Sequence, residues 1–94
     1  MSKNRVEIFD KTIQEVTQQR GEVYGHPRVD FDRAVRIQKV IAECDDVLVR
    51  HALDRIALKI ARLIQTPDHL DSWIDIAGYC RCALMCMDAM SPDE

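Results

Sequence analysis

Two charged stripes on neighbouring predicted helices are the residues of this chain best placed to do chemistry. The basic stripe recurs at steps of four, four and three residues, at His51, Arg55, Lys59 and Arg62. The acidic stripe recurs at steps of three, four and four residues and ends in a hydroxyl, at Asp68, Asp71, Asp75 and Tyr79. Residues at these spacings share one face of an α-helix, so each stripe is a continuous surface of like character.

The stripes are separated by residues 66–67, Thr-Pro, which predict a tight turn between two antiparallel helices. Counting outward from this turn places Arg62 opposite Asp71 and Lys59 opposite Asp75. One interpretation is a structural ladder of salt bridges that fixes the register of the hairpin. The other is a site for a charged ligand, and the two interpretations are compatible.

In the ligand interpretation, Lys59 and Arg62 bind phosphate groups, and the arginine can do so bidentately. Asp71 and Asp75 are the candidate catalytic residues. They are also the candidate ligands of Mg²⁺, a cation that prefers carboxylates and shares phosphate oxygens. Arg55 lies on the same basic stripe, and we include it with Lys59 and Arg62 among the candidate nucleotide-binding residues.

The same register places Arg55 opposite Gly78 and Tyr79. A glycine in a helix interior costs about 1 kcal/mol relative to alanine. We therefore expect Gly78 to make room for a close helix contact or for a ligand, with Tyr79 in the nucleotide-binding set.

An irregular segment at residues 21–29 adds aromatic and hydrogen-bonding groups. Tyr24 and His26 lie within it, flanked by Arg20 and Arg28. Nucleobases are recognised by such aromatic faces, so we predict that Arg20, Tyr24 and His26 bind a nucleotide. The alternatives are that Tyr24 is a hydrophobic plug over the helix ends and that His26 hydrogen-bonds its own loop.

Apolar residues at helical spacing predict four α-helices and no strand. The predicted ranges are about 4–19, 31–43, 47–65 and 68–89. Gly21 is the predicted stop of the first helix, Asp30 the cap of the second, and residues 45–46 the cap of the third. The predicted fold is all-α, with a central antiparallel hairpin in which the third helix is touched on several sides. We expect Trp73 in the core or an interface, and His69 on the surface.

Length and composition bound the function. We expect the 94 residues to form a single helical domain, residues 1–94, and their formal net charge of -3 argues against binding to polymeric nucleic acid. The hydrophobic fraction is 47%, yet so short a chain buries a limited core. We expect part of the apolar surface to lie in the interface of a homo-oligomer.

The four cysteines, at positions 44, 80, 82 and 86, do not have the spacing of a zinc site. We expect free and mostly buried thiols in a reducing compartment. No signal-peptide core and no apolar run near ~20 residues occurs, so we expect a soluble, cytoplasmic protein without membrane contact.

Three motifs together resemble those of a family of small phage and prophage proteins. They are Arg-Gly-x-x-Tyr-Gly-His-Pro-x-x-Asp-Phe at 20–31, Lys-x-x-Arg at 59–62 and Asp-Ser-Trp-x-Asp-Ile-Ala-Gly-Tyr at 71–79. The resemblance spans residues 20–82 and implies location in the cytoplasm of a host cell.

More distantly, the two helices of the hairpin are similar to nucleotide-modification-associated and MazG-like all-α proteins. MazG-like enzymes hydrolyse nucleoside triphosphates to monophosphate and pyrophosphate with Mg²⁺, as helical oligomers. They carry Glu-x-x-Glu on one helix and Glu-x-x-Asp on the next. This chain has Lys59 and Arg62 where the first pair is expected, while Asp71 and Asp75 match the second pair with altered spacing.

The resemblance implies a nucleotide-handling protein, either a MazG-like phosphohydrolase or an accessory to nucleotide modification. A second hypothesis is a non-enzymatic anti-defence protein that sequesters a nucleotide or cyclic nucleotide. A third is a module that binds a host protein, with the motif residues serving as scaffold.

Overall fold

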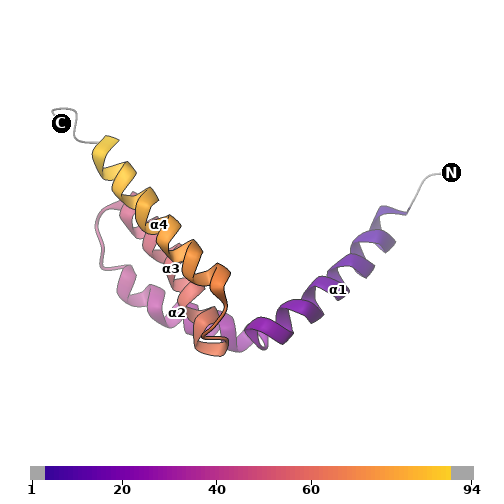
Figure 1. The fold of residues 1–94 in the computed structure, drawn as a ribbon. Coiled ribbons are helices and arrows are strands. Elements are labelled where there is room, and N and C mark those ends of the chain that lie inside the picture. Colours follow the sequence, from indigo (N-terminus) through magenta and orange to yellow (C-terminus); the bar gives the residue numbers. More distant parts are fainter. Residues whose placement is uncertain (1–3, 90–94) are drawn as a thin grey trace.

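The part of the chain that the structure describes folds into four helices. The computed structural model describes residues 4–89. The helices, in chain order, are α1 (Arg5–Tyr24), α2 (Pro27–Ile41), α3 (Val47–Gln65) and α4 (Leu70–Ala89) (Figure 1). No strand occurs within residues 4–89, so the prediction of an all-α fold is confirmed.

Helix α3 is the centre of the structure. It packs against α2 on one side and α4 on another, whereas α2 and α4 do not contact each other. Ala57 and Ala61 of α3 are completely buried, at 0% exposure, and side chains this small let neighbouring helices approach closely. The predicted central hairpin of α3 and α4 is therefore confirmed.

Helix α1 leaves the other three helices and runs away from them (Figure 1). Its 20 residues include none that is buried. The radius of gyration is 17.4 Å, compared with about 12 Å for a compact domain of this length. This excess follows from the projection of α1, which leaves an apolar stripe in solvent, formed by Val6, Phe9, Ile13 and Val16.

The junction between α1 and α2 differs from the prediction. Gly21 does not end the first helix, which continues to Tyr24. The last turn is stabilised by contacts of the Tyr24 ring with residues outside α1. The helix ends at Gly25, whose φ of 78° lies in the left-handed region that favours glycine. A Cβ added at Gly25 would also lie 3.1 Å from the side chain of Gln65.

The cap of α2 is also different from the predicted one. The helix begins at Pro27, and His26 Nδ1 accepts a hydrogen bond of 3.1 Å from the backbone N–H of Arg28. Asp30 is therefore not the cap but a buried residue of the first turn. The prediction for α3 is confirmed, since Asp46 Oδ1 accepts from two backbone N–H groups of its first turn.

Most of the apolar side chains of α4 are exposed. Ser72 is the buried residue of α4. The expectation of mostly buried thiols is wrong, because Cys80 and Cys82 are exposed and Cys44 and Cys86 are half-buried, although all four are free as expected. Trp73 is also exposed, and its indole N–H donates a 2.8 Å hydrogen bond to the carbonyl of Pro67. Nothing among the described helices is long and apolar enough to cross a membrane.

Gly78 gives a direct test of this packing. The expected close contact is wrong within residues 4–89, because a Cβ added at Gly78 would meet nothing within 4 Å. We predict that Gly78→Ala raises the free energy of unfolding by about 1 kcal/mol in urea titrations, since alanine is the better helix former. Gly25→Ala is the contrasting variant and should lower it, because its φ is positive. A loss of stability in Gly78→Ala would show that another molecule packs there.

Candidate functional site

Tyr24 is the centre of a cluster that joins three helices. The guanidinium carbon of Arg62, from α3, lies 4.4 Å from the centroid of the Tyr24 ring. That of Arg20, from α1, lies 5.0 Å from the same centroid. His69, just before α4, meets the ring edge-on, with 5.6 Å between centroids. Two cations and one imidazole therefore converge on one aromatic ring.

Local sequence explains how these groups meet. Arg20 and Tyr24 are four residues apart on α1, so they share a face of that helix. The last turn of α1 is tied to the turn between α3 and α4, where the Thr66 hydroxyl donates a hydrogen bond to the carbonyl of Val23. This bond fixes Tyr24 beside the end of α3, within reach of Arg62.

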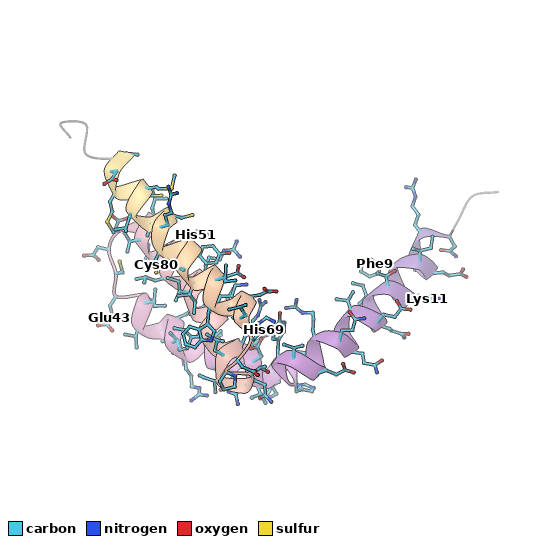
Figure 2. All side chains as sticks on the ribbon, in the orientation of Figure 1. Phe9, Lys11, Glu43, His51, His69 and Cys80 are labelled. Carbon is cyan, nitrogen blue, oxygen red and sulfur yellow. The ribbon has the colours of Figure 1, made fainter. Side chains whose placement is uncertain are left out.

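His69 is a member of this cluster that sequence reasoning missed. Its Nδ1 shares a 2.7 Å hydrogen bond with the hydroxyl of Ser72, which is buried. The side chain is half-buried instead of lying free on the surface as expected. Figure 2 shows His69 at the corner where α1 departs, far from His51. No spacing signal marks this contact, because it joins the last residue of α1 to the turn before α4.

The arginines of the cluster have no acidic partners among the residues that the structure describes. Within residues 4–89, neither Arg20 nor Arg62 has a carboxylate oxygen within 4.0 Å. The Nε of Arg62 is buried and makes no hydrogen bond in that part of the chain. The predicted pairing of Arg62 with Asp71 is therefore wrong, because the guanidinium packs on Tyr24 and Asp71 is exposed.

The second predicted pair of the hairpin does form. Lys59 Nζ lies 3.0 Å from Asp75 Oδ2, with side-chain exposures of 14% for the lysine and 47% for the aspartate. The ladder interpretation is thus confirmed for this one step. Lys59 lies one helical turn from Arg62, so the ion pair borders the Tyr24 cluster.

The other predicted nucleotide-binding residues lie apart from Tyr24 or have another structural role. Arg55 is exposed and precedes Arg62 by two turns of α3, about 10 Å along the axis. Tyr79 is half-buried, farther along α4. His26 caps α2, as in the alternative that it bonds its own loop. A role for these three residues in binding stays a prediction.

A pocket of about 210 Å³ opens beside the cluster, in the angle between α1 and α2. Arg20 and Tyr24 line it, together with Thr17, Gly21, Gly25, Pro27, Asp30 and Phe31. Asp30 is 7% exposed, and its Oδ1 has no hydrogen-bond partner among the described residues. Asp30 and Phe31 belong to the motif at residues 20–31. Because the sequence predicts Asp30 as a helix cap, it does not predict that these two residues line a pocket.

The residues of the predicted magnesium site do not come together as the residues around Tyr24 do. Within residues 4–89, no three His, Cys, Asp or Glu side chains form a group that could hold a metal ion. Asp75 already has the ammonium of Lys59 as its cation, and Asp71 is exposed and forms no ion pair within residues 4–89. These residues do not fit a bound Mg²⁺, so we derive no chemistry through one.

Comparison with known proteins places the chain in a family. Residues 7–87 match the family described as a domain of unknown function, DUF6378. The chain belongs to this family. The DUF6378 domain is also 35% identical over 77 residues to the gene 55 protein of Mycobacterium phage D29. The match covers 80% of this chain and 50% of the phage protein, so the chain spans about half the length of that relative. No solved structure matches it.

Replacing Tyr24 tests whether its ring holds the cluster. We predict that Tyr24→Leu lowers the free energy of unfolding by about 1–2 kcal/mol, because both cation–π contacts are lost. Tyr24→Phe keeps the ring and should stay within about 0.5 kcal/mol of wild type. Chemical denaturation followed by circular dichroism measures both variants. Equal losses in the two variants would show that the phenol hydroxyl, and not the ring, matters.

Proposed function

We propose that this protein binds a nucleotide at the junction of α1, α2 and α3. The observation that carries the proposal is the pair of guanidiniums, from Arg20 and Arg62, that lie against one ring without carboxylate partners among the described residues. A phosphate group supplies the missing negative charge. Arginine binds it in a bidentate, charge-assisted manner, in which each contact is stronger than a neutral hydrogen bond.

The pocket wall favours a nucleotide over a simple phosphate. Asp30 is acceptor-only when it is ionised, and its Oδ1 lacks a donor among residues 4–89. An unsatisfied buried acceptor costs about 1–3 kcal/mol, so a ligand N–H or O–H that reaches this carboxylate would recover up to that much of the penalty on binding. A nucleotide has phosphate at one end and base or ribose donors at the other, which matches the arginines and Asp30.

The two aromatic residues of the site, Tyr24 and Phe31, have different roles in this proposal. Tyr24 has two guanidiniums and an imidazole around its ring, so it orients the arginines. Phe31 lines the same pocket and is exposed, which makes it the better stacking surface for a base. The pocket, at about 210 Å³, is below the usual range of ligand sites, so it suits one base or sugar while the phosphates remain outside.

Nucleotide binding without hydrolysis agrees with the hypothesis of a phage anti-defence protein that sequesters a nucleotide or cyclic nucleotide. It needs the arginines and the pocket but no metal ion. Membership in a family with a phage relative supports this setting. The hydrolytic alternative, a MazG-like phosphohydrolase, needs Asp71 and Asp75 around Mg²⁺, and it rests on the sequence resemblance alone.

Two substitutions separate the two ends of the ligand. We predict that Arg20→Gln weakens both pyrophosphate and nucleoside triphosphate by about tenfold, because one charge-assisted contact is worth at least ~1.5 kcal/mol. Asp30→Ala should weaken the nucleotide but not pyrophosphate. Arg36→Gln is the matched control, since Arg36 is exposed and pairs with Asp32 at 3.0 Å. Isothermal titration calorimetry measures all three variants.

The proposal fails if the wild-type protein binds no nucleotide, cyclic or linear, at millimolar concentration. It also fails if Arg36→Gln reduces affinity as much as Arg20→Gln, because binding would then follow net charge.

The hydrolytic alternative has its own test. We predict that nucleoside triphosphate incubated with the protein and Mg²⁺ is recovered intact by ion-exchange chromatography. Release of monophosphate and pyrophosphate, abolished in Asp75→Asn at unchanged stability, would establish a phosphohydrolase instead.

A further inference from the structure

The apolar stripe of α1 lies in solvent and faces the inside of the angle between α1 and the other helices. Its members are exposed, at Val6, Phe9, Ile13 and Val16. The stripe continues into Arg20 and Tyr24 at steps of four residues, and Tyr24 contacts α3. The stripe is therefore on the side of α1 that is turned toward α3 and α4. Figure 2 shows Phe9 on this side of α1 and Lys11 on the other.

The intervals between the apolar residues of the stripe are the same from either end of the helix. Its steps are three, four and three residues. When two copies of α1 lie antiparallel, Val6 of one faces Val16 of the other, and Phe9 faces Ile13. All four apolar residues then have an apolar partner, and the two halves of the contact are identical. This is the arrangement that a two-fold symmetric interface requires.

We propose that two copies of this protein associate through their α1 helices, antiparallel, in this register. The charged residues support the choice of face, because Glu7, Lys11 and Glu15 lie on the opposite side of α1 and stay in water. A second copy also explains why so long a helix, about 30 Å, projects without burying a residue.

The strength of the contact follows from its size. In this register residues 5–17 of one α1 lie along the same residues of the other. This overlap is about 20 Å long, and a face about 10 Å wide presents roughly 200 Å² on each helix. A standard interface buries about 800 Å² on each partner. The α1 pair is therefore a reversible dimer that dissociates on dilution, unless α2 adds to the interface. Phe31, which lines the pocket, and Val35 are two exposed apolar residues of α2.

The first test is the mass of single variants over a concentration series by sedimentation velocity. Wild type is expected to shift from monomer to dimer as concentration rises. Ile13→Glu should remain monomeric, because it brings a charge into the contact while the monomer fold, which does not bury this side chain, is unaffected. Lys11→Glu places the same residue on the outer side and should still dimerise.

The second test addresses register. Phe9→Lys and Ile13→Glu chains, each monomeric alone, should form a mixed dimer, because the new lysine of one faces the new glutamate of the other. Val6→Lys mixed with Ile13→Glu should not, since position 6 faces position 16. Arg20→Gln should leave the dimer intact, so a failure of nucleotide binding does not affect this proposal.

Three results would overturn the proposal. Wild type that is monomeric at every concentration would mean that a second copy does not cover α1. A dimer unaffected by Ile13→Glu would place the interface elsewhere. Equal recovery in both mixtures would exclude this register.

Discussion

The contact between Tyr24 and Arg62 determines the rest of the arrangement. It joins the last residue of α1 to the last turn of α3, and the bond from Thr66 to Val23 holds the same junction. Because the ring takes the guanidinium of Arg62, that arginine does not reach Asp71, and the hairpin keeps one ion pair, Lys59–Asp75, where the sequence suggests two. Arg20, on the same face of α1, is then brought beside Arg62. A positively charged corner follows from one aromatic residue.

This corner differs from the site that a salt-bridge ladder would make. In a ladder, every cation is neutralised within the protein and nothing is left for a ligand. Here the neutralised pair, Lys59–Asp75, lies one turn away, and the arginines at Tyr24 have no carboxylate oxygen within 4.0 Å among residues 4–89. The nearby pocket adds a buried carboxylate, Asp30, with one unsatisfied oxygen. In the proposed site, one end lacks a negative charge and the other lacks a hydrogen-bond donor from the described residues. A nucleotide can supply both, whereas a bare anion supplies only the charge.

Sequence periodicity predicted four helices, the central position of α3 and the Lys59–Asp75 register, because all three depend on local spacing. It misplaced the end of α1, since Gly21 is tolerated inside a helix whose last turn is held by a distant contact. It also missed His69 and assigned Asp30 to a cap, because neither side chain's partner can be read from neighbours in sequence. The exposed stripe of α1 was visible in the sequence, but only the projection of the helix shows that this chain does not cover it.

The central claim is that Arg20 and Arg62 receive an anionic ligand. Nuclear magnetic resonance of the arginine Nε–Hε groups, during titration with a nucleoside triphosphate, tests it most directly. Signals from Arg20 and Arg62 should move together and saturate, while that of Arg36, paired with Asp32, stays in place. Saturating shifts confined to arginines outside the Tyr24 corner, or no shifts at all, would contradict the claim.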